Sequence, residues 1–339
     1  MFDLQPDRGL DTLMQKTKQV YAFDENADFK AYKKELKAKL SELLGIDEIQ
    51  KNKRAIDINI EYDQKKDGYR LIRFYFNSEI LTFIPCYLLI PDTGKRSYPL
   101  AITLQGHKSG GMYNSIGVVK DADDEEYQPR GAFALQAVQN GYAALCVELR
   151  GMGELVHNLK YRGRCDYEAS RALMMGRTIL GERVWDVMRA IDMCSFFPEI
   201  NLNKILITGN SGGGTLSFYA ACMDERIKLC VPSCSFCPYD KSIMYVPHCI
   251  CNYIPQAYKY FEMQDLAALI APRRLVIVAG QKDDIFLIDG VRRGFETVKK
   301  IYDKAGKPNN CRLIETPKGH YWCEDIVWPA INEQMALIK

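Results

Sequence analysis

The chain has 339 residues, 47% hydrophobic and 26% charged, which is typical of a globular protein of one or two domains. Forty-five Lys and Arg residues against 43 Asp and Glu leave a net charge of +2. Such a balanced charge creates no overall field that would draw the chain to nucleic acid or to an anionic membrane. No apolar run reaches the roughly 18 residues that a membrane helix needs.

The first seven residues, Met1 to Asp7, show neither the basic nor the apolar region of a secretory signal. The sequence contains twelve Cys, too small a fraction for a disulfide scaffold. Without a signal peptide, these cysteines predict free thiols in a reducing cytoplasm.

Residues 1–50 predict an N-terminal helical extension. Apolar residues recur at helical spacing over 28–44, with Asp28 as N-cap and Gly45 at the end. Three extended runs follow, at 56–62, 69–76 and 84–90. Asp67-Gly68 favours a hairpin turn, so we expect these strands to pair antiparallel.

From residue 99 onward, short strands alternate with helices. The predicted strands are 100–104, 142–147, 204–208, 229–231, 275–279 and 312–315. The predicted helices lie near 130–140, 167–197, 213–223, 289–304 and 324–337. Such alternation predicts an α/β fold with a mostly parallel central sheet flanked by helices. We therefore expect residues 51–339 to form one catalytic domain.

Residues 232–261 break this alternation. The segment is rich in Pro, Cys and Tyr and predicts a long, irregular, lid-like insertion. We expect it to arch over the carboxyl edge of the sheet. Its tyrosines would then offer an aromatic face to a sugar and narrow the acyl pocket, or they would pack the insertion onto the domain or form an oligomer contact. These residues are Tyr239, Tyr245, Tyr253, Tyr258 and Tyr260.

The segment Gly209-Asn210-Ser211-Gly212-Gly213 lies between a predicted strand and a predicted helix. In this setting G-x-S-x-G is typical of a nucleophile elbow, in which a Ser hydroxyl projects above the edge of the sheet. Glycines on either side let neighbouring backbones approach without a Cβ clash. Ser211 is therefore the candidate nucleophile.

A Ser nucleophile needs an imidazole base oriented by a carboxylate, and in this fold the order along the chain is Ser, acid, His. Of the four His, only His248 and His320 follow Ser211. His320 comes just after the last strand and is favoured. After the penultimate strand come Asp283 and Asp284, of which the G-x-x-D spacing favours Asp283.

An oxyanion needs backbone donors near the nucleophile. The fold supplies one from the residue after the Ser and one from the loop after the strand at 100–104. We assign these two N–H groups to Gly212 and His107. For Arg150, which lies in a Gly-flanked loop, we expect a role in holding its loop through backbone carbonyls.

With these motifs together, the chain resembles an α/β-hydrolase of the acetyl xylan esterase-like branch, related to dienelactone hydrolase-like enzymes. The resemblance covers roughly residues 80–325. It implies a serine esterase acting on small acyl esters, acetyl esters of sugars or xylo-oligosaccharides among them. Many relatives have His-Gly where this chain has Gln105-Gly106, and Asp-x-Arg-Gly-x-Gly-x-Ser where it has Glu148 at the first position and Glu154 near the last.

Two other functions stay open. One is a serine peptidase of the same fold. The other is a non-catalytic zinc or thiol module built on the cysteines of 222–251, where Cys234-x-x-Cys237 and His248-Cys249-Ile250-Cys251 resemble zinc spacing. Since the second pair is C-x-C and free Cys are common in cores, we predict no metal and no cofactor. The expected partner is a small acyl ester, without nucleic acid or membrane, and homo-oligomerisation stays open.

Overall fold

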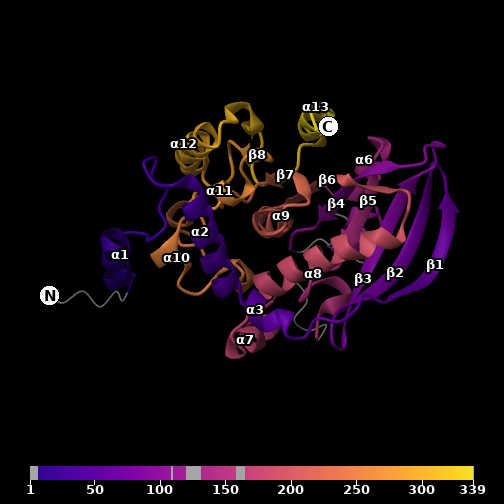
Figure 1. Cartoon of the computed structure of the whole chain (residues 1–339), viewed down its shortest axis with the longest axis horizontal. Helices are drawn as coiled ribbons and strands as arrows, with labels where there is room; N and C mark the ends of the chain where they lie inside the picture. The colour runs from indigo at the N-terminus through magenta and orange to yellow at the C-terminus, as the bar shows by residue number, and fades with distance from the viewer. Residues whose placement is uncertain (1–6, 108–109, 120–130, 158–164, 339) are drawn as a thin grey trace.

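The computed structural model describes residues 7–107, 110–119, 131–157 and 165–338. Its centre is one nine-stranded sheet (Figure 1) in the order β1-β2-β3-β5-β4-β6-β7-β8-β9. The strands are β1 (Ile58–Lys66), β2 (Tyr69–Glu79), β3 (Thr82–Pro91), β4 (Tyr98–Leu104), β5 (Ala143–Val147), β6 (Ile200–Asn210), β7 (Ile227–Ser233), β8 (Arg274–Gly280) and β9 (Cys311–Thr316).

The longer helices are α1 (Asp7–Lys16), α2 (Phe29–Leu44), α6 (Phe133–Gln139), α7 (Asp166–Met174), α8 (Ile179–Met193), α9 (Gly212–Met223), α12 (Ile288–Lys304) and α13 (Glu324–Ala336). Shorter ones are α3 (Ile46–Gln50), α4 (Met112–Ser115), α10 (Ala257–Tyr260) and α11 (Ala267–Ile270). Among the described residues, none of these helices has the length and apolarity needed to cross a bilayer.

The sheet is antiparallel at its N-terminal edge and parallel elsewhere. Strands β1 to β3 pair antiparallel with each other, and β3 pairs antiparallel with β5. The hairpin turn predicted at Asp67-Gly68 is confirmed, because Lys66 pairs with Tyr69 and Gly68 has φ of 78°. From β5 to β9 every pairing is parallel, so the carboxyl ends of these strands meet at one edge.

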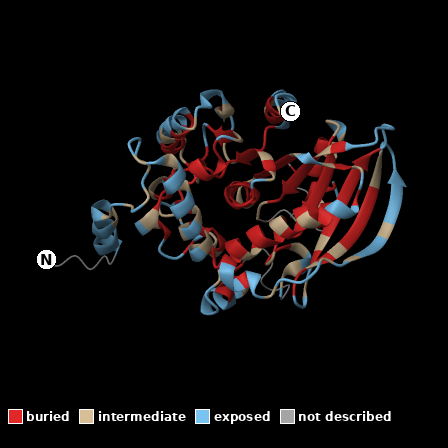
Figure 2. Ribbon diagram, viewed as in Figure 1, coloured by how far each residue is buried: buried red, intermediate tan, exposed pale blue. Residues whose placement is uncertain are grey.

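The central strands of the sheet are largely buried (Figure 2), and their successive residues enter two different cores. In β4, Leu100 and Ile102 belong to one buried cluster and Ala101 to the other. In β6, Ile207 and Leu206 divide in the same way. Helices α8, α9 and α12 cover the first face, while α6 and α13 cover the second. The predicted layering, with helices on both faces of the sheet, is confirmed.

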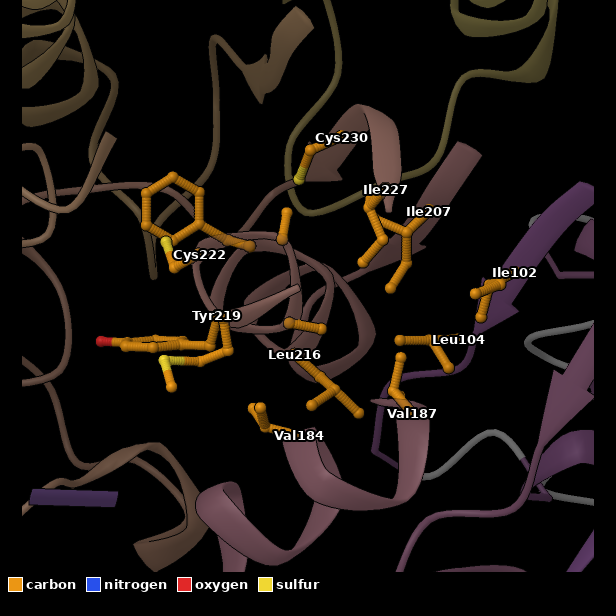
Figure 3. Close-up of a cluster of buried hydrophobic side chains, with 14 of the residues drawn as sticks. Ile102, Leu104, Val184, Val187, Ile207, Leu216, Tyr219, Cys222, Ile227 and Cys230 are labelled. Atoms are coloured by element: carbon orange, nitrogen blue, oxygen red, sulfur yellow. The ribbon is translucent and has the colours of Figure 1, made fainter. Parts of the chain in front are cut away.

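The helix that follows Ser211 lies in the middle of the first core. Every residue of α9 after Gly212 is buried. Figure 3 shows Leu216 of α9 among Leu104 and Ile207 of the sheet and Val184 of α8. Truncating a fully buried Leu typically costs about 2–5 kcal/mol, so this packing gives the elbow a rigid base.

The helix predicted over 167–197 is divided into α7 and α8. Gly176 has φ of 69°, a conformation that ends a helix. Thr178 then caps α8 by accepting a hydrogen bond from the Gly181 N–H at 2.9 Å. The apolar spacing of both helices is right, but the turn between them was not predicted.

The N-terminal helix α2 begins and ends as predicted. Asp28 caps it through the Ala31 N–H at 2.8 Å, and Gly45 adopts the left-handed conformation at its end. Its buried residues, with those of α3, join the same core as α8 and α9. The Thr178 hydroxyl also donates to the Leu44 carbonyl at 3.1 Å, so the end of α2 is joined to the start of α8.

Candidate active site

Ser211 lies at the turn between β6 and α9 with φ of 56° and ψ of −125°. This backbone conformation is strained for a residue with a side chain and is the one a nucleophile elbow uses. The flanking glycines make the turn possible. A Cβ on Gly209 would lie 2.3 Å from the Leu104 carbonyl oxygen, and one on Gly213 would lie 2.1 Å from it.

The structure pairs His320 with Asp283. His320 Nδ1 lies 2.9 Å from Asp283 Oδ2. The other carboxylate oxygen, Oδ1, accepts hydrogen bonds from the N–H groups of Ile285 at 2.9 Å and Phe286 at 3.0 Å. The Asp283 side chain is fully buried, whereas Asp284 is exposed. Of the two adjacent aspartates, only Asp283 contacts the imidazole.

The surroundings of Asp283 keep its carboxylate ionised. Burial alone would raise its pKa, but the hydrogen bonds from His320, Phe286 and Ile285 lower it below the usual value. An ionised acceptor at Nδ1 favours the tautomer that carries its proton there. The opposite nitrogen, Nε2, is then left as the basic atom.

The carboxyl ends of β6 to β9 bring the three predicted residues to one edge. The Ser211 N–H donates to the Ser233 carbonyl at the end of β7 at 2.9 Å. The next residue, Cys234, lies with its sulfur within 4.8 Å of ligand atoms of both Asp283 and His320. Ser211, Asp283 and His320 thus follow β6, β8 and β9, three of four successive strands in the sheet.

The loop after β4 runs directly against the elbow. A Cβ on Gly106 would lie 3.1 Å from Ser211 Cβ, and one on Gly212 would lie 3.0 Å from His107 Nδ1. The backbone N–H groups of Gly212 and His107 donate to no other backbone carbonyl in the described residues. The two residues predicted to supply the oxyanion donors, Gly212 and His107, are therefore neighbours at the elbow, and their use as donors stays a prediction.

The two departures from the resembling family are in contact with each other. Gln105 Nε2 donates to Glu148 Oε1 at 3.0 Å. Glu148 is fully buried and also accepts from the N–H groups of Leu149 and Glu154. Burial raises its pKa to about 7, with these donors opposing the rise. The Gln105–Glu148 pair thus fixes the base of the loop that carries His107.

Arg150 holds its loop through carboxylates rather than through the backbone carbonyls that the sequence led us to expect. Its guanidinium contacts Asp186 at 2.7 Å, Glu79 at 2.7 Å and Glu182 at 3.3 Å. These partners are nearly buried, so the cluster is an internal ion network. These ion pairs balance the charge of Arg150 inside the protein, and no contact between Arg150 and substrate is needed to explain this residue.

His248 lies near the candidate base without joining the pair. The Phe286 ring stacks on His320 with centroids 5.9 Å apart and meets His248 edge-on at 5.3 Å. Burial and the nearby imidazoles of His107 and His320 lower the pKa of His248. Both histidines contact the Phe286 ring, but of the two only His320 is hydrogen-bonded to a carboxylate among the described residues.

Several tyrosines of the insertion pack against neighbouring elements. Tyr239 is buried and shares a hydrogen bond with the Tyr219 hydroxyl at 2.7 Å. Tyr260 stacks on Tyr21. Together with α1, Tyr239, Tyr253 and Tyr258 line a cavity of about 740 Å³ that contains none of the three candidate catalytic residues. Tyr239 and Tyr260 thus pack the insertion onto α9 and the N-terminal segment instead of offering an aromatic face to a sugar, whereas Tyr245 is exposed.

Residues 248–251 are the part of the insertion that does reach the site, and they bring cysteines. The donor atoms of His107, Cys165, Cys249 and Cys251 all lie within 4.8 Å of one another. Sequence spacing suggested only the last two, because Cys165 and His107 are 58 residues apart and Cys251 is 144 residues from His107. Cys237 lies elsewhere, against the carbonyls of Lys241 and Leu287. All twelve cysteines are free thiols.

Comparisons with known proteins agree with this fold. A model of the abhydrolase family matches residues 7–325. The hydrolase candidate YtaP of Bacillus subtilis (strain 168) is 25% identical over 241 residues, which cover 70% of this chain and 78% of YtaP.

Solved structures share the fold over nearly the whole length. A candidate acetyl xylan esterase from Bacteroides fragilis superposes with a TM-score of 0.83 at 19% identity, covering 98% of this chain and 95% of its own. A glucuronoyl esterase from Solibacter usitatus gives a TM-score of 0.68 at 13% identity, with coverages of 95% and 98%. The fold is that of the α/β-hydrolases, and the chain belongs to the abhydrolase family.

Proposed function

We propose that this protein is a serine esterase that hydrolyses small acyl esters, acetyl esters above all. The observation that carries the proposal is the His320–Asp283 pair, 2.9 Å apart, at the same sheet edge as Ser211 with its positive φ. A Ser in such a turn, together with an oriented imidazole, is the arrangement that acyl transfer requires.

The proposed reaction has two halves. His320 Nε2 takes the proton from Ser211 Oγ as the oxygen attacks the ester carbonyl. Asp283 holds the imidazole and stabilises its positive charge without itself taking a proton. The N–H groups of Gly212 and His107 bind the oxyanion. His320 then gives its proton to the leaving alcohol, and a water activated in the same way cleaves the acyl-enzyme.

The acetyl preference is supported by likeness of fold to the acetyl xylan esterase candidate of Bacteroides fragilis. The glucuronoyl esterase neighbour makes a sugar-acid ester the second substrate to test. The sugar is the alcohol part of an acetylated sugar and the acyl part of a sugar-acid ester. The two substrates therefore differ in which side of the ester bond carries the sugar.

The decisive experiment compares the wild type with Ser211→Ala on p-nitrophenyl acetate, butyrate and octanoate, and on a methyl ester of glucuronic acid. We expect kcat/KM to fall from acetyl to octanoyl, and Ser211→Ala to lose about 10⁴–10⁶ in rate. Near-normal turnover by the variant would remove Ser211 from the mechanism. Activity that rises with chain length would exclude an acetyl esterase.

A further inference from the structure

Four metal-binding side chains meet beside the elbow, from three distant segments. His107 lies in the loop after β4, Cys165 directly precedes α7, and Cys249 and Cys251 come from the insertion. His107 Nε2 is 3.1 Å from Cys251 Sγ and 3.7 Å from Cys165 Sγ. The Cys249 sulfur lies within 4.8 Å of the other three donor atoms.

These spacings suit one tetrahedral zinc ion. Zinc binds thiolate sulfur at about 2.3 Å and imidazole nitrogen at about 2.0 Å. Ligand atoms around such a centre are therefore roughly 3.5–3.8 Å apart. Three cysteines and one histidine form a known structural zinc set, and soft thiolates exclude magnesium and calcium.

The other buried cysteines show what a thiol does when it is only part of the core. Cys222 faces the Leu266 carbonyl and Cys230 faces the Ser217 carbonyl, each at 3.5 Å. Each thiol acts there as a weak donor to the backbone. In the cluster of four, by contrast, three sulfurs and a nitrogen all face one another.

A buried cation beside the cluster is an independent indication of negative charge. Arg183 is 3% exposed, and its Nη2 donates to Cys165 Sγ at 3.1 Å. It also donates hydrogen bonds to the Arg150 carbonyl and interacts with Cys251. No carboxylate among the described residues forms an ion pair with Arg183. A guanidinium buried in this way needs an anion.

Three thiolates and a neutral imidazole around Zn²⁺ carry a net charge of −1, which is the counter-charge that Arg183 lacks. Hydrogen bonds from neighbouring groups to metal-bound sulfur are a regular feature of such centres. We propose that His107, Cys165, Cys249 and Cys251 bind one zinc ion in a closed tetrahedral site, with Arg183 as the charged group that supports it.

All four positions of this site are filled by protein, so the ion has no open position for water or substrate and its role is structural. It ties the insertion and the start of α7 to the loop that carries His107 and runs against the elbow. The ion would hold the oxyanion side of the site in place without taking part in the chemistry. The binding itself does not depend on the proposed esterase activity.

The test measures metal in the purified full-length chain. The protein is expressed with zinc in the medium, purified under reducing conditions and dialysed against a weak chelator. We expect about one zinc per chain in the wild type and in the control Cys237→Ser, whose thiol is buried in the same insertion but outside the cluster. Cys251→Ser and Cys165→Ser should lose most of the zinc.

Cobalt gives a readout that does not depend on how well the cysteine variants fold. Wild-type protein reconstituted with Co²⁺ should show intense thiolate-to-cobalt charge-transfer absorption and the visible bands of a tetrahedral complex. Folded wild-type protein without zinc, or Cys251→Ser with as much zinc as the wild type, would overturn the proposal. So would a disulfide joining two of Cys165, Cys249 and Cys251 in the wild-type protein, which peptide mapping after thiol alkylation would locate.

Discussion

Gly106 and Ser211 lie so close that a Cβ on the glycine would stand 3.1 Å from the Cβ of the serine and 3.0 Å from the Asn210 carbonyl oxygen. The loop after β4 and the nucleophile elbow are therefore in direct backbone contact. The absence of a side chain at position 106 allows the loop to lie this close to the elbow.

Gly106→Ala should lower kcat/KM on p-nitrophenyl acetate by about 10²-fold, because a small displacement of the reacting groups is enough to cost that much. Thermal unfolding should change little. Gly9→Ala, where a Cβ meets nothing within 4 Å, serves as the control. Unchanged kcat/KM in Gly106→Ala would show that this contact does not position the donors.

The two adjacent aspartates should differ sharply in their effect on turnover. Asp283→Asn removes the charge that orients His320 and should slow kcat by about 10²–10⁴. Asp284→Asn alters an exposed side chain and should leave kcat close to the wild-type value. Steady-state rates on the same ester measure both, and equal losses would contradict the assignment of Asp283.

The two histidines near Phe286 should also differ in their effect on turnover. His320→Ala removes the proposed base and should reduce kcat by about 10⁴–10⁶. His248→Ala removes a ring that contacts Phe286 but has no carboxylate partner, so it should retain most of the activity. If His248→Ala abolished turnover and His320→Ala spared it, the base would be His248.

Glu148 should make folding stability depend on pH. Burial raises its pKa from 4.5 to about 7, so the folded state keeps a proton that the unfolded state releases. The stability that Glu148 contributes is complete below pH 4.5 and is lost as the pH rises through about 7.

Urea unfolding of the wild type and Glu148→Gln across this pH range tests the assignment. The stability of the wild type should fall relative to the variant by at most about 1.4 kcal/mol per pH unit. The informative quantity is the change of this stability difference with pH. Its absolute value is not, because Gln also changes the hydrogen bonds to Gln105 and Leu149 at every pH. Parallel curves for the two proteins would mean that Glu148 is not protonated in the folded state.

The triad candidates could be predicted because each comes with a local signal. Ser211 has flanking glycines between a strand and a helix, and His320 and Asp283 follow the last two predicted strands. Strand–helix alternation also predicted the sheet, since every expected strand lies within or next to an observed one. The turn at Gly176 was missed because a lone glycine in a helical pattern is a weak signal.

The cysteine cluster could not be predicted, because its four members share no local spacing. Only folding brings Cys165 and His107 to Cys251. The only signals for it in the sequence were the His248-Cys249-Ile250-Cys251 segment and the general abundance of Cys. The packing of Tyr239 and Tyr260 could not be predicted either, because loops that bind a ligand through aromatic residues and loops that pack onto neighbours through them have the same composition. Only contacts such as that between Tyr239 and Tyr219 separate the two roles.

The burial of α2 and α3 bears on how this protein is cut into fragments. Leu36, Leu40 and Leu44 are completely shielded from water by the same core that supports α8 and α9. A recombinant fragment starting at residue 51 would expose that apolar surface, and exposed patches of this kind lead to aggregation. A minimal active fragment should therefore keep α2 and α3 and start at Asp28 or earlier.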